Sequence, residues 1–446
     1  MSAGHNENNS LKYSLKNHHK NLFFSSLGGA LEFYDFIIFV FLAPTISKLF
    51  FPQEGTSDLI LMLKSFGIFA TGYIARPFGG IVLSHFGDIR GRKSVFSISI
   101  FMMAFATLAM AALPTYQTIG IAAPIILTVL RILQGLAIGG EVPGAWTFIS
   151  EHVPARRVGF SCGCVATALH FGIFFGALIS TILRYYFSPE EVLSYAWRIP
   201  FIIGGFFGLI SIVLRRCILE TPVFLKIKNM KAAQYQFPLK NVLNEHLSST
   251  IIAFLLSWST SVGTMVLTML TPIFLQKQYA FNEFTAVTSN LISVFFCLIG
   301  MCLSGLLIDR ISPSKFLISG GFLLAVSSAI FYSCLGLGVL TEKWLFILYS
   351  ITHFFVGMTA AFPYILVRLF PARVRYSGIS LSHNTAFAVS GATTPILIAL
   401  FMGSYPMTLT FVMLSISLMI ITMGLYFGMR GSSVLQKSYG SEELIS

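Results

Sequence analysis

Residues 160–183 read FSCGCVATALHFGIFFGALISTIL, and no lysine, arginine, aspartate or glutamate interrupts the run. A helix needs about 20 consecutive apolar residues to cross a bilayer, so this run is long enough for one crossing. Runs of the same kind recur at residues 95–113, 199–214, 251–275 and 407–429. They do not alternate polar and apolar residues as the strands of a membrane barrel do. The sequence therefore predicts an all-α membrane protein.

The composition of the whole chain agrees with this prediction. Only 10% of its 446 residues are charged and 55% are hydrophobic, whereas soluble domains carry about 25% charged residues. We predict twelve transmembrane helices, with spans at residues 22–47, 60–85, 94–113, 119–150, 159–184, 198–214, 249–276, 285–308, 316–338, 344–369, 376–402 and 407–429.

The distribution of basic residues sets the topology. The net charge is +12, and 20 of the 29 lysines and arginines lie outside the spans on one side, against 5 on the other. Such an excess marks the cytoplasmic side of a membrane protein. Both termini are therefore predicted to be cytoplasmic, and the basic charge indicates topology rather than a nucleic-acid partner. Residues 1–20 contain no short apolar region before a small-residue cleavage site, so we expect no removable signal peptide.

The chain divides into two halves. A basic segment at residues 215–248 separates a first half of six helices (22–214) from a second half (249–429), with cytoplasmic ends at 1–21 and 430–446. Two loop patterns of the first half recur in the second: Asp88 corresponds to Asp309, and Pro154 corresponds to Pro371 at nearly the same spacing along the chain. Two unrelated patterns at nearly the same offset indicate duplicated halves, a construction used by one class of transporters.

Five motifs follow one another along the chain. They are EFYDF (32–36), RPFGG (76–80), SHFGDIRGRK (84–93), QGLAIGGE (134–141) and FPARVRYSG (370–378), with Asn384 beyond the last. Together they resemble the major facilitator superfamily, and within it the metabolite:proton symporter branch, which includes proline/betaine, alpha-ketoglutarate, citrate and shikimate permeases. The chain departs from the family pattern at Ser84, Ile89 and Arg368, where a glycine, a basic residue and an acidic residue are usual. The resemblance implies two pseudo-symmetric six-helix halves in a bacterial inner membrane, driven by a proton gradient without a cofactor.

Charged side chains inside the predicted spans are the strongest functional signal. Glu32, Asp35 and Glu141 lie deep in spans, together with Arg76 and Arg131. Each such charge costs about 2.5–3.5 kcal/mol at a helix centre, so these groups must face the protein interior or a watery cavity. Glu32 and Asp35 are three residues apart on one helix face, where two carboxylates repel and one is expected to hold a proton. Asp35 and Glu32, ahead of Glu141, are our candidates for proton coupling. The alternative is a static ion-pair network that holds helices together.

The two embedded arginines are candidates for substrate binding. A guanidinium group binds a carboxylate bidentately, so Arg76 and Arg131 could clamp a substrate carboxylate. Equally, they could be counter-ions of the embedded acids, and the sequence leaves both readings open. A lone membrane histidine is more often hydrogen-bonded between helices than a proton relay. The remaining substrate-binding candidates are polar residues within spans: Tyr34, Gln134, Asn384 and His170.

The cytoplasmic loops predict a conformational latch. In the family fold Asp88 lies near the start of the eleventh helix, whose N-terminal dipole attracts an anion, and Arg92 can pair with Glu151. Such links hold the cytoplasmic side shut until the halves rock; plain topological anchoring is the alternative. The predicted latch residues are Asp88, Gly91, Arg92, Lys93, Glu151, Asp309, Arg310, Arg373 and Arg375.

These features predict a secondary active transporter and not an enzyme. We expect a monomer that couples protons to the symport of a small polar metabolite, either a zwitterion such as proline or betaine or a di- or tricarboxylate. The alternatives are an exporter or antiporter of the same fold for a metabolite, siderophore or drug, and a membrane sensor that binds its solute without transport. There is no nucleophile–base constellation, and the missing Walker A sequence argues against an ATP-driven pump. Cys162 and Cys164 fit packing better than a metal site, so no metal is expected.

Overall fold

The computed structural model describes residues 26–27, 29–31, 33–52, 58–90, 92–151, 153–216, 238–372, 374–402, 405–430 and 435. Inside these ranges it does not describe the side chains of several helical residues, including 87–90 and 92–97. Over this part of the chain the secondary structure is helical and includes no strand.

The first half begins with a helix over Gly29–Phe41. It continues with α2 (Ala43–Phe50), α3 (Asp58–Arg90), α4 (Arg92–Ala112), α5 (Tyr116–Ile119), α6 (Ala122–Ser150), η1 (Ala155–Arg157), α7 (Val158–Tyr186), α8 (Pro189–Glu191), η2 (Val192–Ala196) and α9 (Arg198–Arg216). After α11 (Pro238–Glu245), which lies within the predicted central segment, the second half contains α12 (Leu247–Thr264), η3 (Met265–Leu270), α13 (Thr271–Lys277), α14 (Glu283–Ile308), α15 (Pro313–Gly336), α16 (Glu342–Val356), η4 (Gly357–Ala361), α17 (Phe362–Leu369), α18 (Arg375–Met402) and α19 (Thr408–Arg430).

These helices account for the twelve predicted spans. Among the described residues, nine helices are long and apolar enough to cross a membrane. Two bent pairs, Gly29–Phe41 with Ala43–Phe50 and Pro189–Ala196 with Arg198–Val213, each form one further span. The shorter apolar stretch Ile98–Ala112 of α4 fills the remaining place. The prediction of an all-α membrane protein is confirmed.

Prolines mark the places where spans bend or change geometry. Pro44, Pro272 and Pro363 stand in the first turns of α2, α13 and α17. Proline is tolerated there because its missing N–H removes no helical hydrogen bond. A π-helical turn, η3, precedes Pro272, and a 3₁₀ turn, η4, precedes Pro363. The first span of each half is therefore broken near the same end of the bundle.

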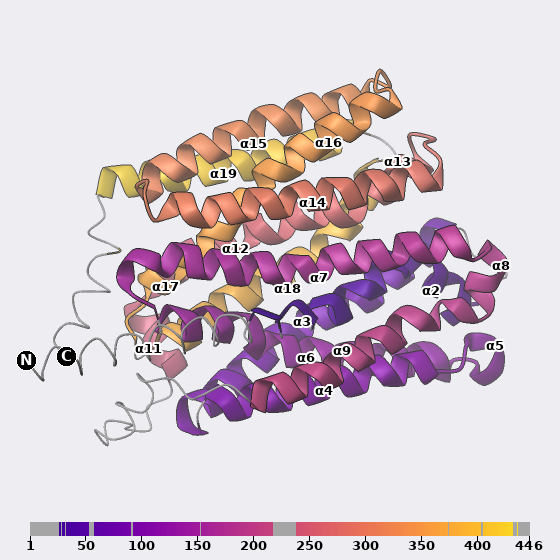
Figure 1. Cartoon of the computed structure of the whole chain (residues 1–446), viewed down its shortest axis with the longest axis horizontal. Coiled ribbons are helices and arrows are strands. Elements are labelled where there is room, and N and C mark those ends of the chain that lie inside the picture. The colour runs from indigo at the N-terminus through magenta and orange to yellow at the C-terminus, as the bar shows by residue number, and fades with distance from the viewer. Residues whose placement is uncertain are drawn as a thin grey trace, which may run out of the picture.

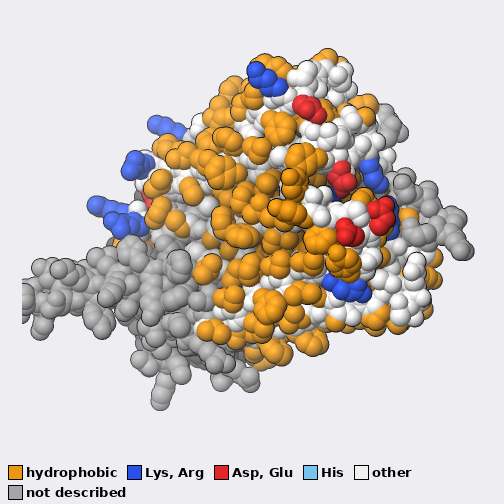
Figure 2. Space-filling view, turned by 45° about the vertical axis from the view of Figure 1, so that its right-hand side comes forward, with side chains coloured by type: hydrophobic (Ala, Val, Ile, Leu, Met, Phe, Trp, Pro, Cys, Tyr) orange, Lys and Arg blue, Asp and Glu red, His pale blue; other side chains and the backbone are white. Residues whose placement is uncertain are grey.

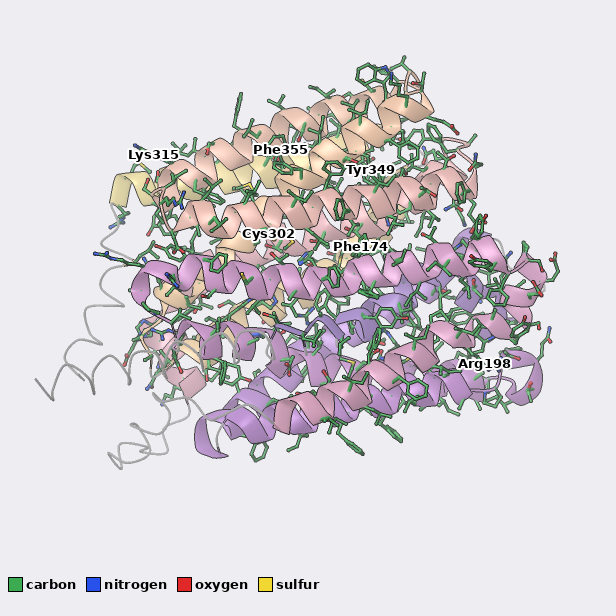
Figure 3. All side chains as sticks on the ribbon, viewed as in Figure 1. Phe174, Arg198, Cys302, Lys315, Tyr349 and Phe355 are labelled. Carbon is green, nitrogen blue, oxygen red and sulfur yellow. The ribbon has the colours of Figure 1, made fainter. Side chains whose placement is uncertain are left out.

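The helices run side by side along one axis, and the two halves meet along two helix pairs (Figure 1). In these pairs α3 packs against α18, and α7 packs against α14. We call the end that carries η1, α11 and the α3–α4 connection the inner end, because the sequence predicts that it faces the cytoplasm. The outer end carries α5, α8 and α13. In Figure 2 hydrophobic side chains cover the flank, and acidic and basic side chains gather toward the ends. Lys315 marks the inner end and Arg198 the outer end in Figure 3.

Glycines make the same close contact in both halves. A Cβ atom on Gly139 in α6 would lie 2.2 Å from the carbonyl oxygen of Arg76 in α3. A Cβ atom on Gly357 in η4 would lie 2.8 Å from the carbonyl oxygen of Cys297 in α14. The separation along the chain between Arg76 and Cys297 equals the separation between the corresponding loop residues Asp88 and Asp309. Backbones approach this closely only where a side chain is absent. The counterpart of Arg76 in the second half is therefore a cysteine, and the charge belongs to the first half alone.

Candidate functional site

Backbone contact between α3 and α6 sets the position of the site. A Cβ atom on Gly135 would lie 1.9 Å from the carbonyl oxygen of Gly72, and one on Gly79 would lie 2.0 Å from that of Leu136. Any larger side chain would push the two helices apart. With the helices this close, α3 brings the fully buried Arg76 against α18 of the other half.

Arg76 is held at the seam between the halves. Its Nε donates a hydrogen bond to Asn384 Oδ1 at 3.4 Å, and its Nη2 lies 3.5 Å from His383 Nε2. The guanidinium carbon lies 4.4 Å from the ring centre of Phe387 and 5.4 Å from that of Tyr73. Nη1 has no hydrogen-bond partner within the described part of the chain. A buried guanidinium with one unused donor is able to bind a carboxylate.

Asn384 orients this arginine. Its Nδ2 donates to the carbonyl oxygen of Gly139 at 2.6 Å and to Ser380 Oγ at 3.2 Å, while its Oδ1 accepts from Arg76. Both ends of the amide are therefore engaged, across the seam and within α18. Asn384, a predicted substrate-binding residue, holds Arg76 and ties the halves together in this conformation.

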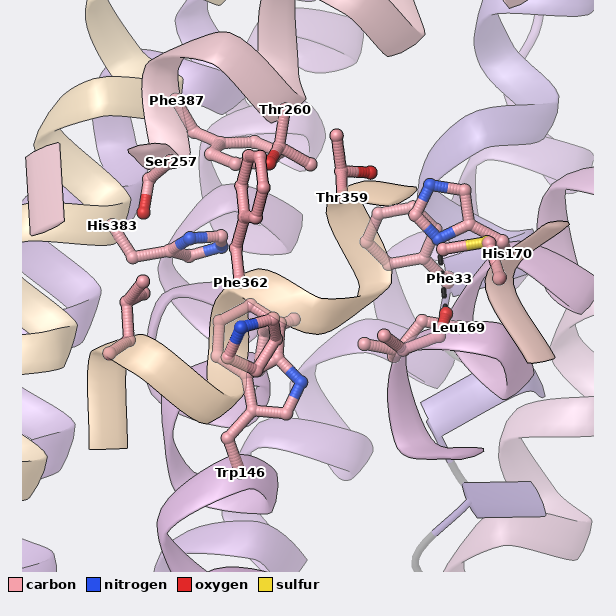
Figure 4. Close-up of a pocket in the computed structure, with 15 residues that line it drawn as sticks. Phe33, Trp146, Leu169, His170, Ser257, Thr260, Thr359, Phe362, His383 and Phe387 are labelled. Atoms are coloured by element: carbon pink, nitrogen blue, oxygen red, sulfur yellow. Dashed lines mark hydrogen bonds between the residues drawn. The ribbon is translucent and has the colours of Figure 1, made fainter. Parts of the chain in front are cut away.

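A small cavity lies beside this cluster, between the two halves (Figure 4). Its volume is ≈ 40 Å³, enough for about three water molecules. Figure 4 shows His383 and His170 on opposite sides of it, with Phe362 and Trp146 between them. Among the described residues, no aspartate, glutamate, lysine or arginine lines it. Its other lining residues are Phe33, Val142, Ala166, Leu169, Ser257, Thr260, Met301, Thr359, Pro363, Leu366 and Phe387.

His383 connects the cavity to Arg76. Its ring lies 4.3 Å from that of Phe387 and 4.9 Å, nearly perpendicular, from that of Trp146. Nδ1 has no hydrogen-bond partner among the described residues. His383 was not among the sequence candidates, although it precedes Asn384 in the predicted span 376–402. The criterion that selected His170, a polar residue inside a span, would have found it.

Asp35 lies in a second polar cluster, inside the first half. It is fully buried, and neither carboxylate oxygen has a hydrogen-bond partner in the described part of the chain. A Cβ atom on Gly204 would lie 2.2 Å from Asp35 Oδ1 and 3.0 Å from the methyl group of Thr107, so the glycine leaves room for both. Thr107 Oγ1 accepts a hydrogen bond from Gln134 Nε2 at 2.9 Å. The carboxyl group therefore sits at the end of a short chain of polar side chains.

Arg131 lies at the other end of this chain. Its Nη1 donates to Gln134 Oε1 at 2.8 Å and to the carbonyl oxygen of Phe36 at 3.1 Å. Its guanidinium carbon lies 4.5 Å and 4.4 Å from the ring centres of Phe36 and Phe39. Over the described residues, neither Arg131 nor Arg76 forms an ion pair with Asp35. Aromatic rings and amide oxygens surround the two cations instead.

The remaining candidates are dispersed. Glu141 is buried in α6 and accepts a hydrogen bond from Ser99 Oγ at 3.1 Å. Tyr34 donates to the carbonyl oxygen of Pro200 at 2.9 Å, which ties the first helix to α9, and it does not line the cavity. His170 does line the cavity, with Nδ1 3.1 Å from the carbonyl oxygen of Ala166. Glu32 lies outside the described residues.

Links between the halves close the inner end. Asp309, just after α14, accepts hydrogen bonds from the backbone N–H groups of Gly159 at 2.8 Å and Phe160 at 2.7 Å, at the start of α7. A Cβ atom on Gly159 would lie 2.6 Å from Asp309 Oδ1, so this contact needs a glycine. Arg368 Nη2 donates to the carbonyl oxygen of Ala155 at 3.1 Å. Asp309 thus occupies the first turn of a helix in the opposite half, the geometry expected for its counterpart Asp88.

Burial is the largest influence on the Asp309 carboxyl group. It raises the pKa above the ordinary value, while the two backbone donors and nearby Arg368 act in the opposite direction. The two backbone donors therefore offset part of the cost of burying this carboxylate.

An ion pair adds a further link at the inner end. Arg375 Nη1 lies 3.8 Å from Glu151 Oε1, and the two side chains are only 4% and 2% exposed. Arg92, the predicted partner of Glu151, has no described side chain, and Arg310 is exposed. Gly91 and Arg373 lie outside the described residues, as do the side chains of Asp88 and Lys93.

Comparison with known proteins agrees with this architecture. The profile of the Major Facilitator Superfamily matches residues 25–395. The chain belongs to the major facilitator superfamily. A provisionally named proline/betaine transporter of Staphylococcus aureus (strain COL) is 31% identical over 386 residues, which is 84% of this chain and 80% of that protein. The proline/betaine transporter of Salmonella typhimurium is 29% identical over 380 residues, 83% of this chain and 75% of that protein.

A solved structure shares the fold at low sequence identity. The proton:xylose symporter XylE, bound to 6-bromo-6-deoxy-D-glucose, superposes with a TM-score of 0.76 at 14% identity, over 93% of this chain and 96% of that chain. Membership of the superfamily makes this protein a multi-pass membrane protein and a secondary transporter, not an enzyme. The predicted family and fold are confirmed.

Proposed function

We propose that this protein is a proton-coupled symporter that imports a small zwitterionic carboxylate of the proline and betaine type. The observation that carries the proposal is Arg76, a buried guanidinium with one unused donor, whose neighbours His383 and Phe387 line the central cavity. One guanidinium balances one carboxylate, which favours a monocarboxylate over a di- or tricarboxylate.

The aromatic wall of the cavity supports a cationic group on the same solute. Phe33, Trp146, Phe362 and Phe387 line the space, and no acid does so among the described residues. Aromatic faces attract quaternary and secondary ammonium groups without a counter-charge. A carboxylate at Arg76 and an ammonium against these rings would satisfy both ends of a zwitterion. The names of the relatives in Staphylococcus and Salmonella support the same solute class.

Asp35 is the proposed proton carrier. A buried carboxyl group without an ion-pair partner favours its neutral, protonated form. When it loses the proton, the new charge lies beside Thr107, and the Thr107–Gln134–Arg131 chain is placed to respond to it. The protonation state of Asp35 is thereby coupled to the hydrogen bonds between helices of the first half.

The proposed cycle needs no cofactor. The solute enters at the outer end with a proton, the links at Asp309 and Arg375 release, and the halves rock to open the inner end. We propose that the protein works as a monomer in the bacterial inner membrane, with both termini in the cytoplasm.

The test uses proteoliposomes that contain a pH-sensitive dye. Betaine or proline added outside should acidify the interior, whereas di- and tricarboxylates and shikimate should not. Asp35→Asn keeps the shape of the side chain but cannot ionise, so it should abolish proton-driven accumulation while exchange of labelled solute continues. Glu190→Gln, at an exposed acid of the outer end, is the matched control and should behave as wild type.

Arg76 has its own variant. Arg76→Lys keeps the charge but loses the planar fork, and we expect KM to rise at least tenfold, the loss of one charge-assisted hydrogen bond. Full accumulation by Asp35→Asn would refute the role of that carboxyl group. If folded wild-type protein gives no signal with any solute, an exporter or a non-transporting sensor becomes the better description.

A further inference from the structure

The outer end holds a second and larger cavity. It measures ≈ 330 Å³ and lies between the halves. Its walls come from the first span with α2, from α7, and from α8 with η2 on one side, and from η3, α13 and α14 on the other. We call it the outer vestibule. Its size is within the range of small-molecule binding sites, whereas the central cavity holds only a few waters.

Cations converge on the outer vestibule. Lys48, Arg184 and Lys277 line it, against one acid, Glu283, within the described part of the chain. The sequence places only 5 basic residues on this side of the membrane, so most of them lie in this one cavity. A hollow lined by one sign of charge concentrates ligands of the opposite sign. The ligand must therefore carry an anionic group.

Arg184 is prepared to receive a carboxylate. Its Nη1 donates to the carbonyl oxygen of Ser180 at 3.3 Å and to the Ser180 hydroxyl, and its Nη2 donates to the carbonyl oxygen of Phe41 at 3.2 Å. These bonds fix the guanidinium plane within the first half. The third nitrogen, Nε, donates to Glu283 Oε1 at 2.5 Å. A carboxylate thus already occupies the open side of a preorganised guanidinium.

Glu283 is the exchangeable member of the pair. It belongs to the second half, in the first turn of α14, and its side chain is 57% exposed against 22% for Arg184. An ion pair this exposed contributes little to stability. When the halves part at the outer end, Arg184 and Glu283 separate, and each half presents one charge to the vestibule.

We propose that the outer vestibule is a loading site for zwitterionic solutes, in which the carboxylate of the solute binds Arg184 and its cationic group binds Glu283. A zwitterion that enters breaks one ion pair and forms two, so it bridges the halves that the pair had joined. Val40, Pro272 and Ile273 supply apolar wall for the methyl groups or ring of the solute. This inference rests on the proposed function in one respect, the zwitterionic nature of the solute.

The test is equilibrium binding of radiolabelled glycine betaine to the full chain in lipid nanodiscs. Arg76→Gln removes the central site, and a weaker class of binding should remain that declines steeply as NaCl is raised. Arg184→Gln or Glu283→Gln in that background should weaken it about tenfold, the loss of one charge-assisted hydrogen bond. Lys277→Gln changes an exposed side chain and leaves the hydrogen bonds of Arg184 intact, so it should weaken betaine binding less. Arg198→Gln, an arginine of the outer end that does not line the vestibule, is the control and should bind as its parent.

Single-charge solutes test the two-ended contact. Acetate and choline each satisfy only one partner, so both should bind at least tenfold more weakly than betaine. Betaine binding that is unchanged by Arg184→Gln and by Glu283→Gln overturns the loading site, even if wild-type protein transports betaine. A different outcome is also distinguishable: both variants weaken betaine binding in the vestibule, but the wild-type protein does not transport betaine. That outcome overturns the proposed symport and supports the loading site.

Discussion

The contact between α3 and α6 can be tested by adding one methyl group. In Gly135→Ala the new Cβ atom would lie 1.9 Å from the carbonyl oxygen of Gly72, and ordinary contact begins at 3.4 Å. Both partners are backbone, so no flexible side chain can move aside and the helices themselves must part. Overpacking of this kind costs about 1–3 kcal/mol, and we expect the upper end of that range because the shift propagates along both helices.

The matched control is a glycine of the partner helix α3. A Cβ atom on Gly67 would have nothing within 4 Å, so Gly67→Ala should be neutral or stabilising by about 0.5–1 kcal/mol. The assay is thermal unfolding of the purified variants in one detergent, together with KM for uptake. Arg76 lies one turn beyond Gly72, so Gly135→Ala should also raise KM, while Gly67→Ala should not. If Gly135→Ala unfolds at the temperature of wild type, the two helices are not in backbone contact and the argument for the position of Arg76 fails.

Three further predictions concern the remaining links. Glu151→Gln and Arg375→Gln should each destabilise the protein by about 3 kcal/mol, because each removes one partner of a buried ion pair; a double-mutant cycle with a coupling below about 0.5 kcal/mol would contradict the ion pair. Burial raises the pKa of Asp309 above its ordinary 3.8 in the closed inner end, and opening to water lowers it again. The closed state therefore binds a proton at Asp309 more tightly than the open state does. Closure becomes more favourable as the pH falls through the raised pKa of the closed state, and this stabilisation is fully present below the ordinary pKa of the open state. Distances between fluorescent labels at the inner end should show this titration, and Asp309→Asn should remove it. Tyr34→Phe loses the bond to Pro200 and should cost about 1 kcal/mol of stability with KM unchanged; a raised KM at unchanged stability would place Tyr34 at the substrate instead.

The spans could be predicted because their signal is local. An apolar run such as residues 160–183 needs no partner to be recognised, and α7 occupies Val158–Tyr186. The same holds for the repeated loops, since the offset between Asp88 and Asp309 recurs in the matching contacts of Arg76 and Cys297. Burial of the embedded charges also followed from their cost in hydrocarbon, and Arg76, Arg131 and Asp35 are fully buried.

The pairing of the charges could not be predicted. From the sequence alone, three acidic and two basic residues inside the spans suggest that they form ion pairs. In the structure Arg76 meets Asn384 and His383 instead, in the opposite half of the chain. The docking of the two six-helix halves determines which side chains face one another across the seam. The residue periodicity within a single helix does not predict this docking. The π-helical turn η3 was not predicted either, because such turns are rare within helices.

The small central cavity has a consequence for the cell rather than for the solute. A space of ≈ 40 Å³ cannot hold a file of water molecules that reaches from one face of the membrane to the other. Aromatic rings surround the two embedded guanidinium groups, so ions would cross a dry barrier. In this conformation we expect the protein to be an electrical insulator. A cell can then keep many idle copies in its membrane without dissipating the ion gradients across it.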